Sequence, residues 1–199
     1  MTRNRLAISQ TERMLRGRIG GARRTHNSHE LIRLMATYAF IALYSEEPET
    51  FDDRLALAAF EVFKAYDFLT PELTFEARLA LLGLPARADV VLVRLDRGWP
   101  PTPAAAVHVT TYNLAALLTG RPNERRPVPG RRTDVASAIL EHRPAPLRRL
   151  IELDIVDIER YGFDGFEPQT WYPIFAALIC RAAAAHGLDL PMRLPAFEN

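Results

Sequence analysis

The chain has 199 residues, of which 48% are hydrophobic, and its formal net charge at pH 7 is +1. This length suits one domain, or one domain with an attached arm, and it suffices to bury a sizeable core. The near-zero net charge excludes a uniformly basic surface of the kind that attracts nucleic acid from every side.

The N-terminus and the apolar segments indicate a protein that is neither exported nor inserted in a membrane. The N-terminus is rich in arginine and has no apolar signal segment, and no run is apolar for long enough to cross a bilayer. Cys180 is the only cysteine, which excludes a disulfide within the chain and suits a reducing compartment. We therefore expect a cytoplasmic protein without a membrane partner.

Charge alternates along the chain in four blocks. Residues 1–33 hold eight arginines and two glutamates, and residues 121–149 hold eight arginines and three acidic residues. Residues 34–120 and 150–199 are acidic overall. A preference for arginine over lysine is typical of a GC-rich coding sequence, so the clustering of the arginines is the more informative signal. The two basic segments are the candidates for contact with an anionic partner.

The first 26 residues are predicted to form a basic mobile arm. Residues 3–18 can form a short amphipathic helix with Leu6, Ile8, Met14 and Leu15 as anchors. The pair Gly20-Gly21 is expected to break that helix, because glycine keeps much freedom in the unfolded chain. Residues 27–199 are then predicted to be a single helical domain.

Two helices folded back on each other, over residues 28–69, are expected to organise this domain. Residues 34–44 carry no charged side chain, so the first helix is apolar nearly all round and is predicted to be buried in protein. Ser28 is its expected N-cap, and Pro48 ends it. The loop that follows is short, which predicts antiparallel neighbours. One face of the second helix carries Leu55, Ala59, Val62, Phe63 and Tyr66.

Proline and glycine signals divide the rest of the chain into further helices. These are expected at residues 71–82, 86–97, 102–119, 133–142, 146–161 and 170–187. An alternative is a short β-hairpin near residues 90–111, in which 90–95 pairs with 107–112, because periodicity does not separate a short apolar strand from a buried helix. The arginine- and proline-rich residues 120–132 are predicted to be an exposed loop. The expected fold is therefore all-α, a compact bundle of about seven or eight helices with an N-terminal basic arm.

Known catalytic and cofactor motifs are missing from the sequence. There is no phosphate-binding glycine loop, no nucleophile elbow and no paired-cysteine zinc spacing. His26 and His29 are three residues apart, whereas the histidines of a zinc-peptidase helix are four apart. We therefore expect no metal and no cofactor.

Four acidic residues crowd the helix expected at 146–161, namely Glu152, Asp154, Asp157 and Glu159. Isoleucine, leucine and valine residues lie between them, which predicts a core helix with a charged outer face. Arg148, Arg149 and Arg160 of the same helix are the expected partners. The alternative is that Asp154 and Asp157, three residues apart, form a functional carboxylate pair.

The first functional hypothesis is a non-enzymatic helical binding or assembly protein with an anionic macromolecular partner. That partner is either a nucleic acid or the acidic surface of another subunit, which would make a homo-oligomer. Aromatic residues are absent from both basic segments, so contact through phosphates rather than base stacking is expected. The arginines predicted to contact the partner are Arg3, Arg5, Arg13, Arg16, Arg18, Arg23, Arg24, Arg121, Arg125, Arg126, Arg131 and Arg132.

The second hypothesis is a helical enzyme or small-molecule-binding protein with an interhelical pocket. Its expected lining residues are His108, Tyr112, Trp171 and Tyr172. His108 and Tyr112 are four residues apart, so they share one face of a helix. No motif favours a particular reaction, so binding is our first interpretation.

Overall fold

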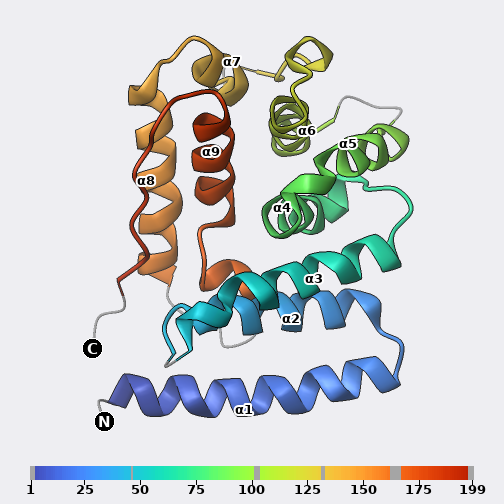
Figure 1. Cartoon of the computed structure of the whole chain (residues 1–199), viewed down its shortest axis with the longest axis vertical. Helices are drawn as coiled ribbons and strands as arrows, with labels where there is room; N and C mark the ends of the chain where they lie inside the picture. Colours follow the sequence, from blue (N-terminus) through green and yellow to red (C-terminus); the bar gives the residue numbers. More distant parts are fainter. Residues whose placement is uncertain (1–2, 46, 101–103, 131–132, 162–166, 197–199) are drawn as a thin grey trace.

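The computed structural model describes residues 3–45, 47–100, 104–130, 133–161 and 167–196. Within these ranges the chain forms nine α-helices and no strand (Figure 1). The prediction of an all-α bundle is confirmed. The alternative β-hairpin is wrong, because residues 88–97 and 106–118 are both helical.

Several helices begin later than the sequence pattern predicts. Short 3-10 helices precede α3, α4, α5 and α9, and each begins with a proline, whose fixed φ suits the first helical position. The predicted starts of α4, α5 and α9 lie two to four residues before the observed ones. The 3-10 turns occupy much of this difference. The helices of the described ranges are α1 (Arg3–Arg24), α2 (Ser28–Ala42), α3 (Phe51–Ala65), α4 (Thr74–Gly83), α5 (Ala88–Arg97), α6 (Ala106–Leu118), α7 (Val135–Leu140), α8 (Pro144–Tyr161) and α9 (Ile174–Ala185).

The first three helices form one antiparallel layer, in which α2 lies between α1 and α3 (Figure 1). The N-cap of α2 is Asn27, whose side chain accepts the N–H of Glu30 at 3.1 Å, so the cap lies one residue before the predicted Ser28. Ten of its side chains between Leu31 and Ala42 are buried, whereas Arg33 and Tyr38 are only partly buried. The predicted burial of this helix in protein and its pairing with α3 are confirmed.

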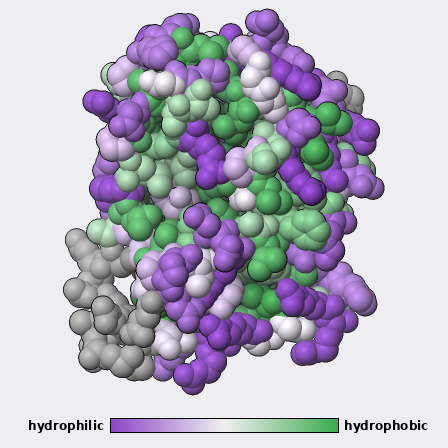
Figure 2. Space-filling view, viewed as in Figure 1, coloured by the Kyte–Doolittle hydropathy of each residue, from purple (hydrophilic) through white to green (hydrophobic). Residues whose placement is uncertain are grey.

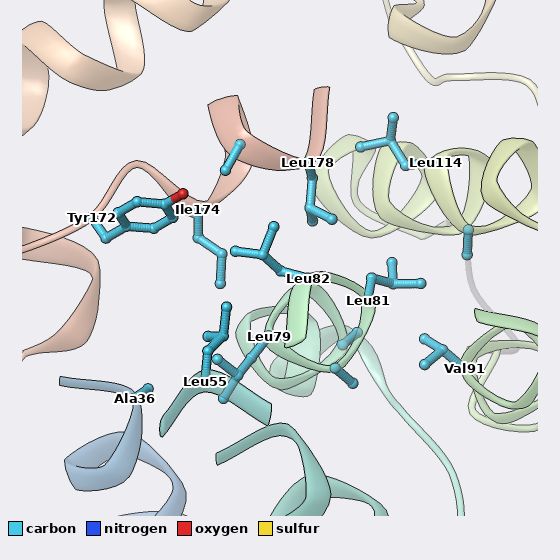
Figure 3. Packing of buried hydrophobic residues seen from close by; sticks show 14 of the residues in the cluster. Ala36, Leu55, Leu79, Leu81, Leu82, Val91, Leu114, Tyr172, Ile174 and Leu178 are labelled. Atoms are coloured by element: carbon cyan, nitrogen blue, oxygen red, sulfur yellow. The ribbon is translucent and has the colours of Figure 1, made fainter. Parts of the chain in front are cut away.

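The central helix of the molecule is α4, which contacts α3, α5, α6 and α9. Its side chains are buried in several directions, as Figure 3 shows for Leu79 next to Leu55 of α3 and for Leu81 facing Val91 of α5. Each large aliphatic side chain buried in this way contributes about 1.5–3 kcal/mol to folding. The sequence pattern places the organising pair at α2 and α3, and the structure adds α4, which packs on four other helices.

Charged side chains from neighbouring helices satisfy the ends of buried helices. Arg94 of α5 donates to the carbonyl oxygens of Phe63, at 2.9 Å, and of Tyr66 at the C-terminal end of α3. Arg181 of α9 donates to the carbonyl oxygen of Leu82 near the end of α4. The last carbonyl oxygens of a helix lack partners within it and carry partial negative charge. The guanidinium groups of Arg94 and Arg181 therefore stabilise the C-terminal ends of α3 and α4.

The N-terminal segment is a 22-residue helix that packs against α2. Gly20 and Gly21 lie within it, so the predicted break at this pair is wrong. The helix continues because Ile19 and Ala22, on either side of the pair, pack on the core. The expected boundary after residue 26 coincides with the turn between α1 and α2. The mobility of α1 stays a prediction. In the structure α1 is helical and lies on α2.

Gly98 ends α5 directly beneath the backbone of Leu69. A Cβ atom at Gly98 would lie 2.4 Å from the Leu69 carbonyl oxygen, at a point where the Leu69 N–H donates to the Arg94 carbonyl oxygen at 2.9 Å. The contact therefore fixes the segment between α3 and α4 on the end of α5.

We expect Gly98→Ala to lower the free energy of unfolding by about 1–3 kcal/mol, because backbone atoms must move to admit the methyl group. The matched control is Gly17→Ala in α1, where no atom lies within 4 Å of the added Cβ. This control should stabilise the helix by about 0.5–1 kcal/mol. Urea unfolding measures both, and equal stability of Gly98→Ala and the wild type would contradict the close contact.

Candidate functional site

α1 has an apolar face toward the body and a basic face toward solvent. Leu15 and Ala22 are buried, and Ile8 and Ile19 pack against the core, at the three- and four-residue intervals of one helix face. Met14, which the sequence suggests as an anchor, is 56% exposed. The helix contains seven arginines and one glutamate.

Arg54 of α3 attaches α1 to the body. Its Nη1 donates to Glu12 Oε1 of α1 at 2.8 Å, and its Nη2 donates to Glu47 Oε2 at 2.6 Å. Its Cζ lies 4.0 Å above the ring centroid of Tyr38, and the side chain is 9% exposed. This guanidinium turns the single acidic side chain of α1 inward, so the basic face of the helix is not neutralised from within.

Two arginines of α1 have partners on α2. Arg18 donates to Glu30 Oε1 at 2.9 Å, and the pair is largely exposed. The Cζ of Arg16 lies 5.5 Å from the ring centroid of Tyr38. Both contacts help to orient α1, and both leave the guanidinium groups at the surface.

Three other arginines of α1 are exposed without such partners. Arg13, Arg23 and Arg24 form no ion pair with any residue of the described ranges. Arg3 and Arg5 belong to the same helix, but their side chains lie outside the described residues. We call the exposed arginines Arg13, Arg23 and Arg24 the basic face of α1.

The second basic segment is fastened to the body. Asn113 of α6, which is buried, accepts the N–H of Arg126 and donates to its carbonyl oxygen, both at 2.8 Å. The guanidinium of Arg126 pairs with Asp96, and its Cζ lies 3.6 Å from the ring centroid of Trp99. Arg126 thus has a structural role, although the sequence predicts that it contacts a partner.

The other loop arginines are also engaged. Arg125 donates to Ser137 Oγ of α7 at 3.1 Å, and Arg121 is 3.6 Å from Glu124 in an exposed pair. Arg131 and Arg132 lie outside the described residues. The loop therefore offers less free positive charge than its composition suggests.

The two basic segments do not form one surface. Figure 1 shows α1 at one end of the molecule and the segment between α6 and α7 near the other. Hydrophilic residues dominate the edge of the molecule where α1 lies (Figure 2). A partner that contacts both segments would have to extend along the molecule.

The predicted alternative pocket is not assembled, because its four residues lie in two aromatic clusters. His108 and Tyr112 flank Trp99, with ring centroids 5.2 Å from it in each case. Trp171 and Tyr172 pack instead among aromatic residues of α2, of the turn that follows it and of the start of α3. The four residues therefore belong to two separate sets of ring contacts, with His108 and Tyr112 in one and Trp171 and Tyr172 in the other.

His108 is fully buried, and neither ring nitrogen has a hydrogen-bond partner among the described residues. Burial lowers the pKa of His108, although Glu72 opposes this shift. The imidazole is therefore neutral at pH 7. A hydrogen bond with the Tyr112 hydroxyl is not formed, and the histidine packs as a ring against Trp99.

The acidic residues of α8 have other partners than the sequence predicts. Arg193, in the segment after α9, pairs with Glu152 at 2.7 Å and with Glu159, in place of the arginines of α8 itself. Its hydrogen bonds lower the pKa of the Glu159 carboxyl to about 2. Asp157 is exposed, whereas Asp154 is directed to α9, so the two carboxylates have different surroundings, although the charge of Asp157 adds to the burial that raises the pKa of Asp154.

Metal-ligand geometry is absent from the part of the chain that the structure describes, where no group of three or more histidine, cysteine, aspartate or glutamate side chains is placed to hold an ion. His29 faces α4 instead, with Nδ1 3.2 Å from the Oε1 of buried Glu76. Among the same residues, no helix combines the length and apolar character needed to cross a bilayer.

A pocket of about 500 Å³ lies where α4, α6, α8 and α9 meet, and no pattern in the sequence predicts it. Its charged lining residues are Arg78 of α4 and Asp154 of α8. A signal for Arg78 exists in the sequence, because it is a charged residue in the otherwise apolar run from Ala77 to Leu82. Only the packing of the four helices decides which groups lie near Arg78.

No protein-family model, curated protein or solved structure matches this chain.

The contact between Arg54 and Glu12 generates a prediction about α1. Glu12→Gln should lower the free energy of unfolding by about 1–2 kcal/mol, because it removes a charge-assisted hydrogen bond from a nearly buried guanidinium. Hydrogen exchange of the α1 amides should become faster.

The control for this prediction is Glu61→Gln, since Glu61 is as little exposed as Glu12 but pairs with the exposed Lys64 one turn away. Its loss should cost less than about 0.5 kcal/mol. Unchanged exchange of α1 in Glu12→Gln would show that Arg54 does not hold this helix.

Proposed function

We propose that this protein is a non-enzymatic helical binding protein that engages an anionic macromolecule through the basic face of α1. The observation that carries the proposal is that Arg13, Arg23 and Arg24 are exposed without an ion pair among the described residues. The one glutamate of the helix is turned inward to Arg54. Positive charge that is not neutralised locally attracts a polyanion and raises its rate of association.

The dimensions of α1 suit a nucleic-acid backbone. Arg13 and Arg24 are separated by about 16 Å along the helix axis, a length over which a duplex carries about nine phosphate charges. Gly17, Gly20 and Gly21 lie between them and leave little side-chain bulk on this part of the helix. α1 is also preorganised on α2, so the arginines need less ordering when a partner binds.

The charge on α1 is almost entirely positive. Its first turn has no acidic residue, and Arg23 and Arg24 lie in its last turn, where they complement the helix dipole. The exposed arginines of α8 differ, since Glu152, Asp157 and Glu159 lie along the same helix. We therefore assign binding to α1 first and to the loop at 120–132 second.

The proposed contacts are to backbone phosphates, and they carry no sequence readout, because no aromatic residue lies on the basic face. The acidic surface of a second subunit is the alternative partner for the same arginines. Glu49, Asp52 and Asp53 are exposed at the start of α3 and would supply such a surface. Both partners depend on the same three side chains, so one set of variants tests both.

The combined variant Arg13→Gln, Arg23→Gln and Arg24→Gln should weaken binding of a fluorescently labelled duplex and of a single strand. Fluorescence anisotropy over a salt series measures the affinity. If all three arginines contact phosphates, the slope of log K against log salt should fall by about 2–3, since each duplex phosphate contact contributes about 0.9.

The matched control replaces three exposed arginines of α8, Arg148, Arg149 and Arg160, with glutamine, which changes the net charge equally. This control should keep most of the affinity and of the salt slope. If the wild type binds neither oligonucleotide, sedimentation of wild type and α1 variant then tests self-association through the same face. Equal mass in both, with no oligonucleotide bound, would refute the proposal.

A further inference from the structure

The pocket between α4, α6, α8 and α9 holds two opposite charges that do not pair with each other. Arg78 and Asp154 both line it, and they form no ion pair with each other or with another described residue. Opposite charges left apart in a partly desolvated site are costly unless something between them compensates both. This arrangement is independent of the basic face of α1.

Arg78 is held in place by contacts that leave part of its guanidinium available. Its Nε donates to Thr111 Oγ1 at 3.0 Å, and its Cζ lies 4.4 Å from the ring centroid of Phe175. No hydrogen bond from its two terminal nitrogens to a described residue is formed. Burial lowers the pKa of Arg78 to about 10, a shift that Asp154 only partly offsets. The group thus remains cationic at pH 7, is preorganised, and has its two terminal nitrogens free to donate to a carboxylate.

Asp154 is oriented by α9. Its Oδ2 accepts the N–H of Ala176, in the first turn of α9, at 3.0 Å. This N–H has no partner within the helix, so Asp154 caps α9 from a neighbouring helix. Its Oδ1 has no hydrogen bond to a described residue. One oxygen is therefore structural, and the other can accept from a ligand.

The remaining lining is mostly apolar and opens to solvent. Val107 and Thr133 are exposed at the pocket, whereas Val135 is buried. The volume of about 500 Å³ lies within the range of small-molecule sites, and such sites combine apolar walls with a few placed polar groups.

We propose that this pocket binds a small zwitterion, an α-amino acid with an apolar side chain, whose carboxylate contacts Arg78 and whose ammonium group contacts Asp154. A ligand with only a carboxylate would meet repulsion from Asp154, and one with only an amine would meet repulsion from Arg78. The apolar side chain would lie against Phe175 and Leu150. The zwitterion is the small ligand that compensates both charges at once.

The test compares leucine with two analogues that each lack one charged group, isocaproate without the amine and isoamylamine without the carboxylate. Saturation-transfer NMR and calorimetry on the full chain measure binding. Leucine should bind. Each analogue should have an affinity at least about tenfold lower, because each loses a charge-assisted contact.

Two variants assign the binding to the pocket. Asp154→Asn keeps an acceptor for the Ala176 N–H and removes the charge, so α9 stays capped while leucine affinity falls about tenfold or more. Arg78→Gln should weaken leucine binding to a similar extent. The control for the first is Asp67→Asn, an exposed aspartate in the segment between α3 and α4, and the control for the second is Arg148→Gln. Neither control should change the affinity.

The outcomes are distinct. The proposal is supported if leucine binds selectively, if both variants weaken this binding and if both controls leave it unchanged. Isocaproate binding as tight as leucine binding, or an unaffected Asp154→Asn variant, overturns the zwitterion site. The absence of binding by all three probes overturns it as well. If Arg78→Gln does not fold, Asp154→Asn and the analogue series still decide the question.

Discussion

At Gly83 the backbones of α3 and α4 approach so closely that a Cβ there would lie 2.7 Å from both the Leu55 carbonyl oxygen and the Ala59 Cβ. This approach places α4 at the centre of the molecule, where α5, α6 and α9 also pack on it. A helix surrounded in this way must bury its own polar groups or direct them into the spaces between neighbours. Arg78 on α4 follows the second course, and the pocket beside it is a consequence of the central position of α4.

Guanidinium groups connect the helices of this protein internally. Arg54 joins α1 to α3, Arg94 caps α3, and Arg181 satisfies a carbonyl oxygen near the end of α4. Arginine suits this use because its planar head has several donors and stacks on aromatic rings, as Arg126 does on Trp99. A high arginine content is therefore a poor measure of the charge that is left for a partner. What matters is which arginines the fold leaves without a partner, and on the described part of α1 these are Arg13, Arg23 and Arg24.

The two proposed sites differ in physical character. The basic face of α1 is exposed to solvent, so its attraction for a partner is long-ranged and screened by salt. The pocket at Arg78 and Asp154 is partly desolvated, so its interactions are short-ranged and depend on the geometry of the ligand. α1 belongs to one end of the fold, and the pocket lies among α4, α6, α8 and α9. The two sites therefore depend on different residues.

The sequence alone determined the helical class, because apolar spacing, prolines at helix entrances and the Asp134 cap of α7 are local signals. It also identified the burial of α2 from an uncharged run, and α1 as a carrier of arginines. It did not reveal that α1 continues through Gly20 and Gly21, since packing of Ile19 and Ala22 outweighs the local cost of glycine. Nor could it place Asp154 at the first turn of α9 or Arg193 beside Glu159, because these partners are separated by more than twenty residues in the chain. Contacts of that kind exist only once helices pack, and they decide which charges are used inside the protein and which are left for a ligand.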